Sequence, residues 1–131
     1  MRARLLLTLL ATAPEPELPD GPPVVRVQAT LRHLATVIAE SPAIAAAATR
    51  SLLSTDPSVQ RLRLLIGVRV VDQLRVAIGE GEDADRVEAV IDAVSLAFFG
   101  ALLHAGMGMS TYAKLADRLD RVVDVIMGDA G

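Results

Sequence analysis

Residues 56–81 read DPSVQRLRLLIGVRVVDQLRVAIGEG, and this stretch decides the fold class. Its apolar residues Ile66, Val70 and Leu74 recur with the period of an α-helix and fall on one side of it. The Asp-Pro pair that opens the stretch is typical of a helix start. The aspartate caps free backbone amides, and the proline at the first helical position loses no hydrogen bond, because an N–H there would have no partner within the helix. The Gly-Glu-Gly run that closes it is typical of a helix end. The sequence therefore predicts a long helix over residues 57–78.

The sequence on either side repeats these signals. A second proline preceded by a capping residue, at Ser41-Pro42, opens an alanine-rich segment, and Ser110 stands before the last periodic segment as its cap. No segment shows the alternating pattern of a strand, and the connections are short, which favours antiparallel neighbours. We predict an all-α antiparallel bundle of about six helices, over residues 2–12, about 23–40, about 42–54, 57–78, about 84–105 and 111–127.

The first 21 residues differ from the rest of the chain. Five of the seven prolines lie within residues 14–23, so this segment is predicted to be a linker. Residues 1–13 join a charged, an apolar and a small-residue region, as a secretory signal does, although the segment is short and Pro14 would directly follow the cleavage point. We expect residues 1–21 to be a helix remnant with its linker, and residues 22–131 to form one domain.

Composition excludes several classes of function. The chain has 131 residues, no cysteine and two histidines, so it has no disulfide or thiolate metal site, and no cofactor or metal is predicted. With 13 basic and 16 acidic residues the net charge is −3, which offers no basic surface for a DNA backbone. The chain has no uninterrupted run of 18 apolar residues, so membrane insertion is disfavoured.

The two last helices carry more apolar surface than one core requires. Between residues 93 and 107 apolar side chains surround the helix, and Leu96, Phe99 and Leu103 fall outside its core face. The final helix has an apolar stripe about 140° wide, whereas roughly 100° is the minimum for an ordinary surface helix. We predict a twofold homodimer in which these helices form a four-helix bundle, with His104 as a hydrogen-bonded interface residue. The alternative is that another helix of the same chain covers this face. The predicted interface residues are Leu96, Phe99, Leu103, Tyr112, Leu119 and Val123.

Arg63 is the one cation on the apolar side of helix 57–78. Its guanidinium must pair with a buried carboxylate, extend to the surface, or meet an anionic or carbonyl-bearing ligand. The other charges of this helix, Arg61, Arg69, Asp72 and Arg75, gather on the opposite, solvated side. No pair of titratable side chains converges as acid–base catalysis requires, so no catalytic residue is predicted.

With its helices placed, the chain resembles the effector-binding and dimerisation domain of TetR-family transcriptional regulators over about residues 22–128. The resemblance lies in the helix lengths and in two local patterns: Glu40-Ser-Pro-Ala-Ile44 leading to Thr55-Asp-Pro57, and Phe99-Gly-Ala-Leu-Leu-His-Ala-Gly106 before a capped final helix. It implies a largely apolar pocket for a small-molecule effector around helix 57–78 and a dimer built on the last two helices. The implied ligand-binding residues are Leu31, Leu34, Ile38, Arg63, Ile66, Val70, Gln73, Leu74, Val94 and Phe98.

The resemblance stops short of DNA binding. Members of the family begin with a helix-turn-helix module, and the sequence predicts none here, so we expect a cytoplasmic homodimer that reaches DNA only through a module missing from this chain. Two alternatives stay open. A ligand-free helical dimerisation module would lack a pocket of at least about 300 Å³. A small all-α secreted enzyme of the mutase kind would need several inward-facing cations, of which the sequence offers only Arg63.

Overall fold

The computed structural model describes residues 17–128, except for the side chains at positions 42, 44, 48, 51, 52 and 62. All regular structure in this range is helical, which confirms the all-α prediction for these residues. The predicted helix over residues 2–12 and the signal-like segment lie outside the described residues. The elements are α2 (Pro23–Ala39), α3 (Pro42–Leu53), α4 (Pro57–Ile78), α5 (Ala84–Gly106), a 3₁₀ turn η1 (Tyr112–Lys114) and α6 (Leu115–Met127).

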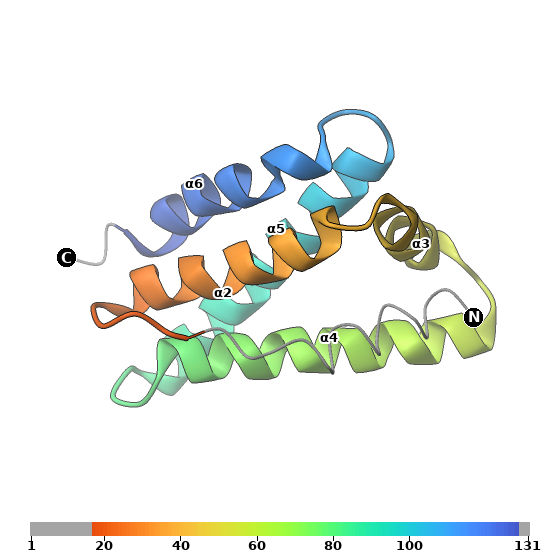
Figure 1. Ribbon diagram of the computed structural model, residues 1–131. Coiled ribbons are helices and arrows are strands. Elements are labelled where there is room, and N and C mark those ends of the chain that lie inside the picture. The colour runs from red at the N-terminus through yellow and green to blue at the C-terminus, as the bar shows by residue number, and fades with distance from the viewer. Residues whose placement is uncertain (1–16, 129–131) are drawn as a thin grey trace.

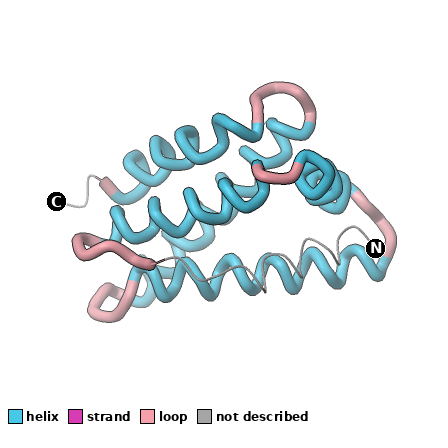
Figure 2. Tube along the Cα trace, in the orientation of Figure 1, coloured by secondary structure: helices cyan, strands magenta, loops and turns pink. Residues whose placement is uncertain are grey.

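The helices form a bundle with α2 at its centre (Figure 1). On either side of α2 lie α6 and α4, and α5 contacts both α4 and α6 from behind. Helix α3 crosses one end of the bundle and is seen along its axis in Figure 1. Short loops connect successive helices, as Figure 2 shows. Helix α2 is therefore covered from several sides, whereas α4 lies along one edge of the bundle.

Both ends of α4 follow from the local sequence. At its start the Asp56 carboxylate accepts a hydrogen bond from the Ser58 amide at 2.9 Å, so the predicted cap is present. At its end Gly79 has φ +78°, a conformation that favours glycine and turns the chain away from the helix. Arg26 of α2 donates to the carbonyl oxygens of Ala77 at 2.7 Å and Ile78 at 2.9 Å. These bonds satisfy carbonyl groups that a helix end leaves unpaired, and they tie α4 to α2.

The prediction that Ser110 caps the last helix is wrong. Thr111 does so instead, because its backbone is extended and its Oγ1 accepts from the Lys114 amide at 3.3 Å. The turn it caps is the 3₁₀ turn η1, and α6 begins only at Leu115. Gly108, with φ +81°, makes the reversal between α5 and this turn.

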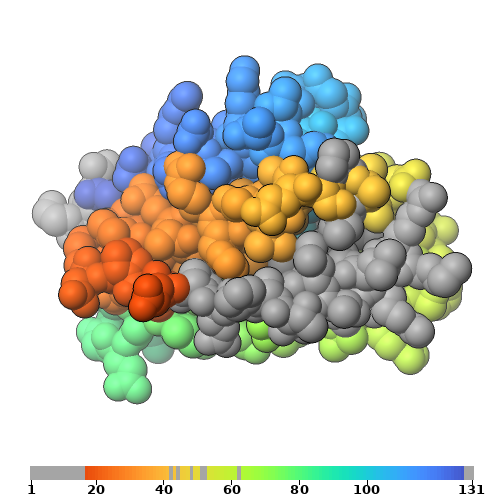
Figure 3. Space-filling model, viewed as in Figure 1, coloured from red at the N-terminus to blue at the C-terminus, as the bar shows by residue number. Residues whose placement is uncertain are grey.

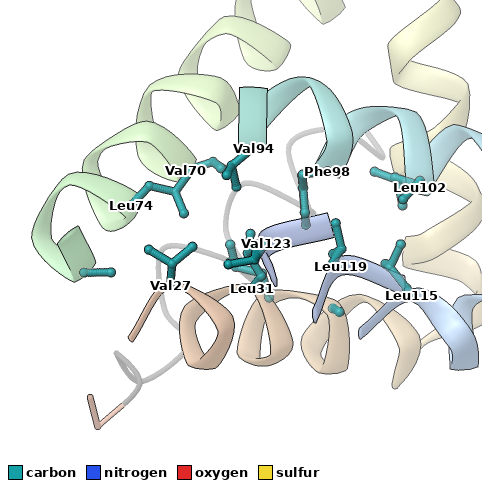
Figure 4. Packing of buried hydrophobic residues seen from close by; sticks show 14 of the residues in the cluster. Val27, Leu31, Val70, Leu74, Val94, Phe98, Leu102, Leu115, Leu119 and Val123 are labelled. Carbon is teal, nitrogen blue, oxygen red and sulfur yellow. The ribbon is translucent and has the colours of Figure 1, made fainter. Parts of the chain in front are cut away.

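The core is formed by all the helices together. Figure 4 shows side chains from α2, α4, α5 and α6 pointing toward a common centre. The predicted face of α2 is confirmed, since Val27, Leu31, Leu34, Ala35 and Ile38 are all at most 2% exposed. Helix α5 alone contributes seven buried residues. By length and composition α5 is also the single described helix able to cross a membrane, and 39% of its most apolar 18-residue stretch is buried inside the bundle.

Candidate functional site

The structure brings the predicted apolar ligand residues together in one cluster. They come from α2, α4 and α5, and each is at most 5% exposed; they are Leu31, Leu34, Ile38, Ile66, Val70, Leu74, Val94 and Phe98. Five of them are labelled in Figure 4, where they point toward one another. Because the residues pack against each other, a ligand that reached them would have to move side chains or helices apart.

The two predicted polar anchors lie at the edge of this cluster. The half-buried Arg63 donates from Nη1 to the carbonyl oxygen of Ser54, at 3.3 Å, in the connection before α4. Gln73 is also half-buried, and its Oε1 is buried without a hydrogen-bond partner. One helical turn earlier, Arg69 has a buried Nε that is likewise unpartnered. An unpaired buried polar atom costs free energy, so the Gln73 Oε1 and the Arg69 Nε on this side of α4 can each still form a hydrogen bond.

Arg69 corrects one sequence expectation. The helical wheel assigned it to the solvated side of α4 together with Arg61, Asp72 and Arg75, and those three residues are exposed. Arg69 is half-buried instead, because it lies at the border of the polar side, next to Gln73. A border position is covered or uncovered by neighbouring elements, which the periodicity of a single helix does not reveal.

The predicted dimer residues divide into two groups. Leu119 and Val123 are at most 1% exposed and point into the core of the protomer, beside Leu31 in Figure 4. Tyr112 is half-buried and serves the protomer as well, since its hydroxyl lies 2.8 Å from Thr49 Oγ1 and 3.2 Å from the Ala45 carbonyl oxygen. The wide stripe of α6 is therefore largely covered by helices of its own chain.

The other predicted dimer residues lie on the outer side of α5. Leu96 is 68% exposed, and Phe99 and Leu103 are half-buried. The Phe99 ring meets Phe98 edge to face, with 5.4 Å between the ring centroids, so it joins the outer side of α5 to the core.

An open groove of about 340 Å³ runs between this side of α5 and α4. Sequence reasoning missed the α4 wall of the groove, because it assigned the outer side of α4 to its charges. Leu64 and Val68 in that wall are 71% and 58% exposed. The residues lining the groove are Leu64, Gly67, Val68, Val71, Asp72 and Phe99. Leu96 lies one helical turn before Phe99 and extends this surface along α5. We call Leu64, Val68, Val71, Leu96 and Phe99 the α4–α5 face.

Charged contacts border both sides of the bundle. An Arg75–Glu88 ion pair joins α4 to α5, and the hydrogen bond and positive charge of Arg75 hold the pKa of Glu88 below its ordinary value. Between α2 and α6, Arg32 pairs with Asp117 at 2.9 Å and with Asp120. Figure 3 shows α2 and α6 packed side by side on this surface. Most of these side chains are exposed to solvent, so we expect the ion pairs to add little to the free energy of unfolding.

His104 belongs to a contact within the protomer. Its Nδ1 lies 3.4 Å from the Arg118 guanidinium and so links α5 to α6. At the opposite end of the bundle, a small cavity of about 80 Å³ is lined by the first residues of α2 and α5 and the last residues of α4 and α6. None of the predicted ligand residues lines this cavity or the groove.

Comparison with known proteins relates the chain to transcriptional regulators. Among the relatives it matches are uncharacterized HTH-type transcriptional regulators of Mycobacterium bovis and Mycobacterium tuberculosis, each 44% identical over 111 residues. The match covers 83% of this chain and 50% of each relative, so the chain spans about half the length of the curated relatives it matches. No protein-family model matches the chain. No solved structure matches it significantly.

Proposed function

We propose that this chain, a homologue of HTH-type transcriptional regulators over 83% of its length, is the effector-sensing and dimerisation domain of a TetR-like regulator. The observation that carries the proposal is the 44% identity with proteins named as such regulators. The all-helical fold and the helix lengths of the TetR resemblance support the choice of domain. The proposal makes the chain a cytoplasmic binding protein without enzymatic activity.

The effector in this proposal is a small, largely apolar molecule that enters between α2, α4 and α5. Side chains such as Leu34, Val70 and Phe98 form an apolar lining, and the unpartnered Oε1 of Gln73 accepts one hydrogen bond from the molecule. Arg63 is the second polar anchor, able to turn from the Ser54 carbonyl oxygen toward a ligand oxygen. A mainly apolar molecule with one donor group fits these residues best.

Signalling follows from the packing of the core. Because the lining residues are tightly packed, an inserted ligand stabilises an arrangement in which α4 has moved relative to α2 and α5. A coupling free energy of about 1–3 kcal/mol between the two arrangements suffices for regulation. DNA contact in this proposal belongs to a helix-turn-helix module outside the described residues, whose spacing in the dimer the ligand alters.

Ligand binding is tested by thermal unfolding of the purified chain with a panel of apolar alcohols, amides and carboxylic acids. A bound compound raises Tm, and titration calorimetry then gives its Kd. Gln73→Leu should weaken that compound roughly tenfold, the effect of losing one hydrogen bond to a buried acceptor. Gln60→Leu, at an exposed position of the same helix, is the matched control and should leave Kd unchanged. A panel without any Tm shift would overturn ligand sensing in favour of a ligand-free dimerisation module.

A further inference from the structure

We propose that the effector is an apolar hydroxy acid, whose carboxylate pairs with Arg69 and whose hydroxyl donates to Gln73. The inference rests on the proposed function, in which the chain binds a small molecule beside α4, and it names the chemical class of that molecule. It also adds Arg69 to the polar anchors of the site, although the periodicity of α4 assigned this residue to the solvated side.

Two buried polar atoms on α4 have no hydrogen-bond partner among the described residues, and they complement one another. The Arg69 Nε is a donor, whereas the Gln73 Oε1 is an acceptor. The two residues are four positions apart, so their side chains are neighbours on the helix surface. They nevertheless do not bond to each other. A ligand that presents an acceptor next to a donor would therefore satisfy both atoms.

This polar pair lies along the edge of the apolar lining. Each of its members directly precedes a core residue that is at most 1% exposed, Val70 or Leu74, and both core residues are labelled in Figure 4. At about 100° per residue, the pair stands on one flank of this apolar stripe. Val71, which belongs to the α4–α5 face, stands on the other flank. The site therefore has an apolar side in the core and a polar side away from α5, which suits an amphiphilic ligand.

The positive charge of Arg69 favours an anion as the accepting group. Helix α2, which packs along α4, contains no acidic residue, and the single acid of α4 is the exposed Asp72. The ion pairs within the described part of the chain involve Arg32 and Arg75 but not Arg69. A carboxylate forms a shorter and stronger hydrogen bond with a guanidinium than a neutral acceptor does. We therefore assign the carboxylate of the ligand to Arg69.

The Gln73 Oε1 determines the second polar group of the ligand. This oxygen can only accept, and a carboxylate that is ionised at neutral pH has no hydrogen to donate. A hydroxyl close to the carboxylate supplies the donor without a second charge, whose desolvation would be costly. The apolar remainder of the molecule then lies among core side chains such as Leu34, Val70 and Phe98.

Three compounds of equal chain length separate the two polar contacts. Titration calorimetry of the purified chain at neutral pH should give the lowest Kd for β-hydroxyoctanoate, which carries both groups. Octanoate lacks the hydroxyl and leaves the Gln73 Oε1 unpaired, so it should bind roughly tenfold more weakly. Octanol lacks the carboxylate and should bind roughly 10- to 100-fold more weakly than β-hydroxyoctanoate, because a hydrogen bond to a charged group contributes more than a neutral one.

Two variants assign these contacts to their residues. Arg69→Met keeps an apolar stem but removes the guanidinium, so it should raise the Kd of both acids roughly 10- to 100-fold and leave that of octanol nearly unchanged. Gln73→Leu should raise the Kd of β-hydroxyoctanoate about tenfold and leave that of octanoate unchanged. Arg61→Met, at an exposed position of the same helix, is the matched control and should change none of these constants.

Circular dichroism and the Tm of the ligand-free variants check that they fold. Neither substitution removes a hydrogen bond from the buried Nε or Oε1, so neither should lower this Tm. If a variant fails to fold, the order of the three compounds on the wild-type chain tests the same two contacts.

The outcomes separate this inference from the proposed function. Octanol that binds as tightly as octanoate would overturn the carboxylate contact and leave ligand sensing in place. Equal Kd values for octanoate and β-hydroxyoctanoate would overturn the hydroxyl contact in the same way. If none of the three compounds binds, the hydroxy acid is overturned, while the wider thermal-shift panel still decides ligand sensing.

Discussion

A substitution at Leu119 tests whether the apolar side of α6 packs in the core of the protomer or in a dimer interface. The sequence placed this residue at an interface, whereas in the structure it is 1% exposed and packs among residues of the core cluster. Replacing a fully buried leucine by alanine removes its transfer free energy and leaves a cavity, which costs about 2.7–5 kcal/mol. We expect Leu119→Ala to lower the free energy of unfolding by about 3 kcal/mol. At an m-value of roughly 2 kcal/mol/M this moves the urea midpoint down by about 1.5 M.

The assay is urea unfolding followed by circular dichroism at two widely different protein concentrations. Leu53→Ala is the control, because Leu53 is a helical leucine with 67% exposure, and its truncation should cost less than about 0.5 kcal/mol. A core role makes the difference between wild type and Leu119→Ala independent of protein concentration. A core role for Leu119 would be contradicted if Leu119→Ala cost no more than Leu53→Ala, or if its effect changed with protein concentration as an interface residue requires.

Three further predictions concern the ends and contacts of the helices. Arg26→Met removes the hydrogen bonds to the carbonyl oxygens at the end of α4 and should lower the unfolding free energy by about 1–3 kcal/mol in urea titrations. Arg26→Lys keeps the positive charge but not the forked guanidinium, so it should restore only part of the lost unfolding free energy. Full restoration by lysine would argue against a role for these hydrogen bonds. Gly106→Ala should lower Tm despite the better helix propensity of alanine, because the added Cβ would lie 2.0 Å from Thr49 Cγ2. An unchanged or raised Tm would contradict this and show that the Thr49 side chain can move away at little cost. Hydrogen bonds from the Ser58 hydroxyl and amide hold the pKa of Asp56 below its ordinary value. The stability that this carboxylate provides is therefore fully present above its unfolded-state pKa of about 4. It is lost as the pH falls through the lower folded-state pKa. Asp56→Asn, which still caps but does not titrate, should therefore lose less stability than wild type between about pH 5 and pH 2, and parallel pH profiles would contradict this.

The local sequence was sufficient to predict a helix end where that end depends only on residues close by in the chain. The predicted bounds of α4 are confirmed, because Asp56-Pro57 and Gly79 act on their own helix ends. The cap of the last helical segment was predicted one residue too early. Ser110 and Thr111 are both good caps, and the choice between them depends on the turn at Gly108. The apolar lining of the proposed pocket was also accessible to sequence, since a periodic apolar stripe must face the core.

Helix order and helix faces are therefore what the sequence by itself determined about this protein. The burial of Leu119 and Val123, the half-buried position of Arg69 and the exposed groove beside Leu64 were decided only by the tertiary structure. The physical reason is that a helical period shows which side of a helix is apolar but not what covers it. A stripe of the same width can face a neighbour in its own chain, a second copy, or solvent, and only the packing of the helices distinguishes these.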